Sequence, residues 1–109
     1  EVPQGTMVFV SGQVARDLDG SVVGVGDITA QTRKVLQNLE AVLAESGATM
    51  DDVVKVTVFV TNLELHFAEI HKVRAEFFTS SYPASTMVEV TSLVDEDMLI
   101  EIEAIAVVQ

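Results

Sequence analysis

The sequence predicts an α+β domain in which two helices cover one face of a β-sheet. Apolar residues recur at helical spacing after Asp27 and again after Asn62, and a strict alternation with a period of two runs through residues 54–61. Further β-rich runs stand near both ends of the chain. The 109 residues are most simply one domain, 1–109, long enough to bury a core.

The first quarter of the chain is expected to form a strand and then a hairpin. β-Branched and aromatic residues dominate residues 6–10, and Ser11-Gly12 interrupts the run before residues 13–16. Asp19-Gly20 is a tight-turn signal, and Ser21-Val22-Val23 follows it.

The first helix is expected to begin after Asp27, a good N-cap residue, and to end at Gly47. Its inward positions are apolar or small and recur at helical spacing: Ile28, Thr32, Val35, Leu36, Leu39, Val42 and Leu43. A central strand should follow, because four valines at 54, 56, 58 and 60 alternate with Lys55, Thr57, Phe59 and Thr61 and so share one face.

A second helix, capped by Thr61 or Asn62, should run to about Phe78. Its expected inner stripe is Leu63, Phe67, Ile70 and Phe77. Tyr82-Pro83 ends this region, because proline cannot continue a helix.

Two further strands are expected at residues 85–93 and 98–108, separated by the acidic turn Asp95-Glu96-Asp97. In the last strand Ile100, Ile102, Ala104 and Ala106 share one face, and Glu101, Glu103, Ile105 and Val107 share the other. That second face is half apolar and half acidic, so it needs a partner of its own, and association through the sheet would supply one.

Composition excludes several classes of function. The net charge is −11, with 17 acidic and 6 basic residues, so the chain would repel nucleic acid and an anionic membrane surface alike. No cysteine is present to form a disulfide or a thiolate site. No histidine spacing is typical of a metal site, and no charged-then-apolar leader precedes the first strand. We therefore expect a cytoplasmic protein with no metal, no nucleic-acid partner and no membrane partner.

Two pairs of side chains are the candidates for chemistry. Glu101 and Glu103 share a strand face about 6–7 Å apart, which suits acid–base work but is also the spacing of two solvated strand carboxylates. His71 and Arg74 lie three residues apart on the second helix, where they either meet an anion or simply border the core. Residue spacing alone does not decide between these alternatives.

Motifs spread over the whole chain resemble the RidA (YjgF/YER057c/UK114) family. The order and spacing of these motifs carry the resemblance: Ser11-Gly12-Gln13, Asp27-Ile28, Gln31-Thr32, Asn38-Leu39, Gly47, Asp51-Asp52-Val53-Val54-Lys55, Phe77-Phe78, Pro83-Ala84 and Ile100-Glu101-Ile102-Glu103-Ala104-Ile105-Ala106. The resemblance implies a chorismate-mutase-like fold with a mixed sheet, assembled as a homotrimer around a central β-barrel. Its ligand clefts would hold a small molecule at the subunit interfaces.

Active members of that family hydrolyse reactive enamines and imines, of the 2-aminoacrylate type, to a 2-oxo acid and ammonia without a cofactor. The resemblance implies that Glu101 positions the attacking water and that the backbone of Gly12 lines the cleft. Ser85, Thr86 and Met87 would contact the substrate, Met87 through its carbonyl, and His71 would stand where the family often has asparagine. Glu103 would be structural.

This chain departs from the family at the anion clamp. The family motif Pro-Ala-Arg-Ser/Thr has Ser85 in place of the arginine here, and Arg74 replaces an aromatic residue. A serine cannot supply the bidentate charged contact of a guanidinium. A family segment with a substrate-facing tyrosine would lie just before Glu1.

Two readings of function follow. One is a deaminase acting through Glu101 and water, and the alternative is a non-catalytic trimeric module that binds a small metabolite or has a regulatory role. In a further, less favoured reading, Arg74 or protonated His71 reaches the cleft and replaces the lost charge. It is disfavoured because long side chains on an outer helix are expected to extend to solvent.

Overall fold

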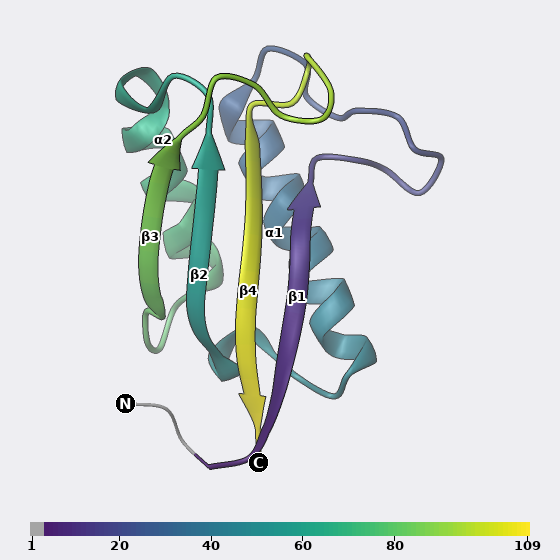
Figure 1. The fold of residues 1–109 in the computed structure, drawn as a ribbon, viewed down its shortest axis with the longest axis vertical. Coiled ribbons are helices and arrows are strands. Elements are labelled where there is room, and N and C mark those ends of the chain that lie inside the picture. Colours follow the sequence, from purple (N-terminus) through teal and green to yellow (C-terminus); the bar gives the residue numbers. More distant parts are fainter. Residues whose placement is uncertain (1–3) are drawn as a thin grey trace.

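The computed structural model describes residues 4–109, and over this range two α-helices pack on one face of a four-stranded sheet (Figure 1). The strands are β1 (Thr6–Val14), β2 (Val53–Val60), β3 (Ala84–Glu89) and β4 (Ile100–Val108). The helices are α1 (Ile28–Glu45) and α2 (Leu63–Phe77), and the short 3₁₀ helix η1 (Met50–Asp52) precedes β2.

The sheet is mixed, with the strand order β1-β4-β2-β3. The β2–β3 pair is parallel because α2 crosses over between these two strands, whereas β4 pairs antiparallel with both β1 and β2. The expected α+β architecture with two helices on one face is confirmed.

The core lies between the helices and one face of the sheet. The alternation expected in the last strand is confirmed, since the buried side of β4 consists of Ile100, Ile102, Ala104 and Ala106. From α1 the fully buried apolar side chains are Val35, Leu36, Leu39 and Leu43. The opposite side of the sheet carries no helix and is called the open face below (Figure 1).

Both ends of α1 match their sequence signals. The side chain of Asp27 accepts a hydrogen bond from the Ala30 backbone N–H at 3.1 Å, as an N-cap should. Gly47 has φ of 74°, a left-handed conformation that suits glycine, and the Ala48 N–H donates to the Leu43 carbonyl at 2.9 Å.

Two side-chain amides on α1 hold the ends of two strands. Gln31 is fully buried, and it donates to the Asp97 carbonyl at 2.7 Å and accepts from the Leu99 N–H at 2.8 Å, just before β4. Asn38, two helical turns later, donates to the carbonyls of Val14 and Arg16 at 2.9 Å each. The loop before β4 and the end of β1 are therefore both attached to the same helix.

The central strand differs from expectation at its start. Val53 is buried and pairs with Ala106, and the register shifts before Lys55. Val54 lies at that irregularity and is only partly buried, so the buried valines are 53, 56, 58 and 60.

The buried face of the second helix and the lengths of the last two strands also differ from expectation. Phe67, expected on the inner stripe, is 53% exposed, and the buried residues of α2 are Ile70, Val73 and Arg74. Asn62 is the N-cap residue but makes no capping hydrogen bond with its side chain; instead, the Glu89 carboxylate accepts from the Leu63 N–H at 2.8 Å. The strands are shorter than expected, with β3 ending at Glu89 and β4 beginning at Ile100.

Across residues 4–109, neither helix has both the length and the apolar character that crossing a bilayer requires.

Candidate functional site

The first part of the candidate site is a close approach between β1 and β4. The pairing of these strands shifts between Val10 and Gln13, so Ser11-Gly12 forms a bulge in β1. A methyl group added at Gly12 would lie 2.6 Å from the carboxyl carbon of Glu101. Only glycine lets the backbone come this near to the carboxylate.

The Glu101 side chain is available for chemistry. It lies on the open face and is partly buried, whereas Glu103, two residues along the same strand, is exposed. None of the hydrogen bonds among residues 4–109 uses the Glu101 carboxylate. Its oxygen atoms can therefore accept hydrogen bonds from a water molecule or a ligand.

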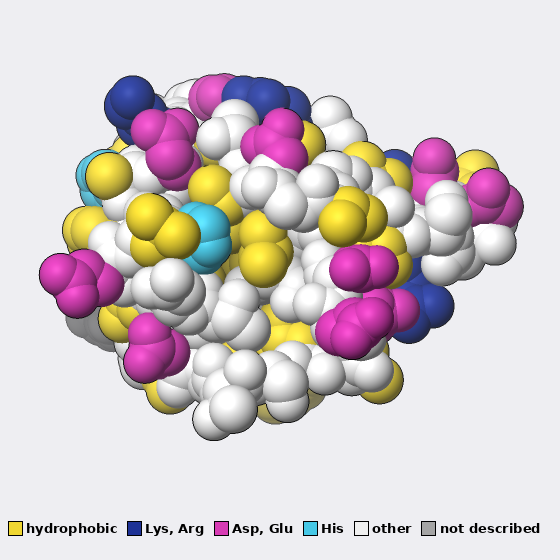
Figure 2. Space-filling model, turned by 90° about the horizontal axis from the view of Figure 1, so that it is seen from above, with side chains coloured by type: hydrophobic (Ala, Val, Ile, Leu, Met, Phe, Trp, Pro, Cys, Tyr) yellow, Lys and Arg dark blue, Asp and Glu magenta, His cyan; other side chains and the backbone are white. Residues whose placement is uncertain are grey.

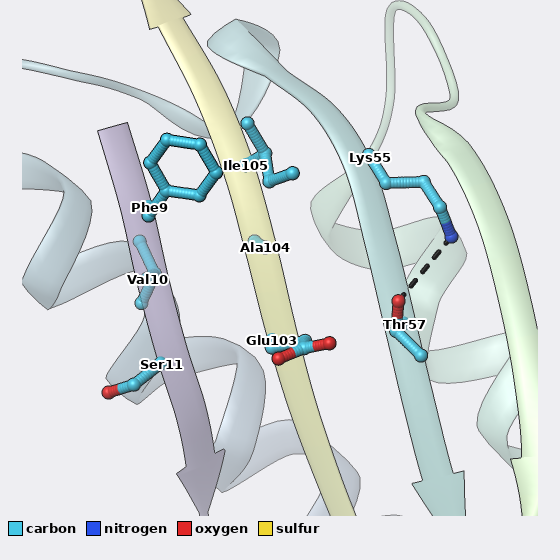
Figure 3. A pocket seen from close by; sticks show the side chains of 8 residues that line it. All are labelled: Phe9, Val10, Ser11, Lys55, Thr57, Glu103, Ala104 and Ile105. Atoms are coloured by element: carbon cyan, nitrogen blue, oxygen red, sulfur yellow. Dashed lines mark hydrogen bonds between the residues drawn. The ribbon is translucent and has the colours of Figure 1, made fainter. Parts of the chain in front are cut away.

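Further along the open face, a hollow of about 330 Å³ is lined by apolar and polar side chains (Figure 3). Phe9 and Ile105 supply its apolar part, and Glu103, Thr57 and Lys55 supply its polar part. Phe9 is 70% exposed, so a large apolar side chain stands uncovered beside these charges.

Thr86 joins this polar row from β3. The Lys55 Nζ donates to Thr86 Oγ1 at 3.0 Å, to the Val56 carbonyl at 2.8 Å and to Thr57 Oγ1 at 3.4 Å. All three protons of the ammonium group thus have acceptors within the chain. Lys55 is satisfied without a ligand.

The second part of the candidate site lies at the β3 edge of the sheet. Ser85 pairs with Val56 of β2, whose side chain faces the helices, and the Ser85 hydroxyl accepts a hydrogen bond from Arg74 Nη2 at 2.9 Å. Arg74 is only 8% exposed. The expectation that its side chain extends to solvent was therefore wrong, because the guanidinium turns inward to the strand that α2 covers.

Burial lowers the pKa of Arg74, and the nearby Tyr82 hydroxyl acts in the opposite direction. An arginine starts from so high a pKa that it stays protonated at neutral pH. The guanidinium is therefore a buried positive charge.

The sequence contained a signal for this burial. Arg74 stands four residues after Ile70 and four before Phe78, and both of these side chains are buried. The helical period therefore predicts Arg74 on the buried side of α2. The general tendency of arginine to reach solvent predicts the opposite, and here the period is correct.

The other two predicted binding residues lie on the helix side of the molecule. Met87 is partly buried and packs against the core, and it pairs with Val58. His71 is exposed on α2, where its ring stacks on Phe67 with centroids 6.2 Å apart and planes at 10°.

One copy of the chain does not bring the two parts of the site together. Glu101 and Ser85 lie on opposite faces of the sheet, and β2 separates their strands. Ser85 is level with Ala104 of β4, two strands away, and Glu101 lies three residues from Ala104 along that strand. Ser85 and Glu101 are therefore about 10 Å apart across the strands and about 10 Å apart along them. A pocket using both would need a second copy of the chain.

Apolar and uncharged groups fill much of the end of the molecule where β1 and β2 finish (Figure 2). Asp and Glu side chains are spread around this end, and the Lys and Arg side chains stand at its margins (Figure 2). Among residues 4–109 no group of three or more His, Cys, Asp or Glu side chains is arranged to hold a metal ion.

Comparison with known proteins places the chain. Residues 1–108 match the family model described as "Endoribonuclease L-PSP". The crystal structure of a member of the YjgF/YER057c/UK114 family from Mycobacterium tuberculosis superposes with a TM-score of 0.84 at 38% identity, covering 97% of this chain and 82% of that one. The chain belongs to the RidA (YjgF/YER057c/UK114) family.

Other RidA-like relatives agree. A RutC family protein of Pyrococcus abyssi is 45% identical over 102 residues, which are 94% of this chain and 79% of that protein. The structure of E. coli TdcF with bound serine has a TM-score of 0.87 at 38% identity, covering 99% of this chain and 85% of that chain. The fold is the chorismate-mutase-like fold of RidA proteins, and in this member the guanidinium of Arg74 on α2 contacts the Ser85 hydroxyl on β3.

Proposed function

We propose that this protein hydrolyses enamines and imines of the 2-aminoacrylate type to a 2-oxo acid and ammonia, in clefts between the copies of a homotrimer. The observation that carries the proposal is the Glu101 carboxylate, which is partly buried, free of internal hydrogen bonds among residues 4–109, and held against the Gly12 backbone. Membership of the RidA family supports the reaction class.

The chemistry asks little beyond a positioned base. 2-Aminoacrylate takes up a proton from solvent at its methylene carbon and becomes the iminium ion, and water then adds to the carbon of the C=N bond. Glu101 accepts one proton from that water and delivers it to the nitrogen. The C–N bond then breaks, ammonia leaves, and the remaining hydroxyl proton returns to solvent as the ketone forms. One water is consumed, and pyruvate and ammonia are the products.

Assembly of several copies supports this site in two ways. The open face carries Phe9 and Met7, which are 70% and 51% exposed, and a second copy would cover them. A site that used both Glu101 and Ser85 would need such a second copy, because one copy holds them on opposite faces of the sheet. E. coli TdcF holds serine, a small amino acid with a carboxylate, and this favours a ligand of similar size here.

The test is release of ammonia from 2-aminoacrylate generated freshly in the assay. Wild type should accelerate release, and Glu101→Gln should reduce that acceleration by about 10²- to 10⁴-fold. Glu103→Gln is the matched control, because it removes a carboxylate from the same face of the same strand and should leave the rate within a few-fold. Equal rates for wild type and Glu101→Gln would refute the proposal.

The alternative is a trimeric module that binds a small metabolite without chemistry. Ser85 in the position of the motif arginine favours it. No ammonia release from wild type, with retained binding of a 2-oxo acid that Glu101→Gln leaves unchanged, would favour this alternative.

A further inference from the structure

Arg74 is a buried cation without an acidic partner among residues 4–109. Its side chain is 8% exposed, and none of the ion pairs in this range includes it. The chain has 17 acidic residues, yet none of those described lies within 4.0 Å of this guanidinium. Its one side-chain hydrogen bond goes to a neutral hydroxyl, that of Ser85.

This arrangement leaves the charge without an acidic partner among residues 4–109. The guanidinium makes one side-chain hydrogen bond, and its other nitrogen atoms are not among the fully buried atoms that lack a partner, so they keep some access to solvent. A mostly buried charge whose remaining donors still reach solvent is a candidate for binding an anion.

The surroundings of Arg74 leave a route for an anion. Ser85 lies on the edge strand β3 and is exposed, and the neighbouring Tyr82 is 58% exposed. The Ser85 oxygen accepts a hydrogen bond from Arg74 Nη2, so the Ser85 O–H is free to donate to a ligand. An anion at this edge would meet a hydroxyl directly and the positive charge immediately behind it.

We propose that Arg74 and Ser85 together form a carboxylate-binding subsite, in which the Ser85 hydroxyl touches the anion and Arg74 supplies the charge from α2. This deepens the proposed function, on which its choice of ligand rests, because it gives the 2-aminoacrylate-type substrate a place for its carboxylate. The subsite thus keeps a positive charge for the carboxylate, but a helix residue, Arg74, supplies it instead of an arginine on the strand at position 85.

The subsite makes Ser85→Arg a poor repair on its own. A second guanidinium would stand beside Arg74 in a partly buried position, where like charges repel. The double change Arg74→Met with Ser85→Arg avoids this repulsion and should restore carboxylate binding. This reciprocal exchange separates the subsite from a merely structural contact.

The experiment compares pyruvate with pyruvamide, which lacks the carboxylate, by NMR titration of the ¹⁵N-labelled full chain. Wild type should prefer pyruvate, and Arg74→Met should weaken pyruvate binding about 10- to 100-fold with little effect on pyruvamide. Lys72→Gln is the matched control: it removes one positive charge from the same helix at an exposed position, and the preference for pyruvate should persist.

Two further measurements accompany the titration. Arg74→Met should keep the assembly mass of wild type in sedimentation and should unfold at the same temperature or higher, because an unpaired buried charge has been replaced by an apolar side chain. A fall in unfolding temperature together with unchanged pyruvate affinity would show that the guanidinium is structural.

Three results would overturn the subsite: wild type without preference for pyruvate, Arg74→Met with the preference intact, or Arg74→Met with a changed assembly mass, which would mean that the guanidinium pairs with another copy. The titration needs no turnover, so it is independent of the deaminase proposal. That proposal fails on the ammonia assay even if the preference for pyruvate is found.

Discussion

Replacing Gly12 by alanine tests whether the close approach of β1 to Glu101 matters for activity. The added carbon would lie 2.6 Å from Cδ and 2.9 Å from Cγ of Glu101. Non-bonded carbon atoms are most stable at about 3.5–4.0 Å, so the carboxylate has to move by roughly 1 Å. Gly12 is not among the residues with positive φ, so its backbone accepts alanine without strain.

The two expected effects of Gly12→Ala differ in size. The carboxylate is the end of a flexible, partly buried side chain, so the fold should lose only about 1 kcal/mol, or about 4–8 °C in Tm. A misplacement of about 1 Å at a catalytic group costs about 10²-fold in rate. The variant should therefore be folded but nearly inactive.

The assay is ammonia release at saturating 2-aminoacrylate, with thermal unfolding measured on the same preparations. Ser11→Ala is the control, because it changes the neighbouring exposed residue of the same bulge and should keep both properties. If Gly12→Ala turned over at the rate of wild type while Glu101→Gln was inactive, the position of the carboxylate would not depend on this contact, and the reasoning would be refuted.

Three further predictions concern stability. Gln31→Leu leaves a buried carbonyl and a buried N–H unpaired at the start of β4 and should lower the free energy of unfolding by about 2–4 kcal/mol in urea titration. Asn38→Ala frees two carbonyls at the end of β1, which are nearer to solvent, and should cost about 1–2 kcal/mol in the same measurement. The Arg33 guanidinium, hydrogen-bonded at 2.8 Å, holds the pKa of Glu76 below its ordinary value of 4.5. This ion pair therefore stabilises the fold at pH values above the ordinary pKa of a glutamate, and the stabilisation is lost as the pH falls through the lowered pKa of Glu76. Replacing Glu76 by glutamine should therefore make Tm decrease less steeply as the pH is lowered. An unchanged slope for Glu76→Gln would contradict this assignment.

The fold was predictable where local periodicity and burial agree. The alternation in residues 100–106 and the capped pattern after Asp27 both describe the buried side of the structure. Prediction failed where a tertiary contact replaces the local rule. Asn62 is the N-cap of α2, as expected, but the capping hydrogen bond comes from Glu89 on a distant strand. The loop before β4 is held by Gln31, so the start of β4 is not encoded nearby.

The candidate site was predictable only in part. The family motifs pointed to Gly12 and Glu101, and the structure places these two together. The Arg74–Ser85 contact was disfavoured, because arginine usually extends to solvent and only the packing of α2 on β3 turns it inward. Whether Thr86, Met87 and His71 contact a ligand stays a prediction.

The attachment of both strand ends to α1 has a consequence for hydrogen exchange. Gln31 holds the residues that lead into Glu101, and Asn38 holds the residues that follow Gly12. If either side-chain contact opens, Glu101 or Gly12 is no longer attached to α1. Backbone amides at 99–101 and 13–16 should therefore exchange with deuterium as one cooperative unit with α1, while the exposed turn at residues 18–20 exchanges much faster. The carboxylate and the glycine would then separate only when the helix itself opens.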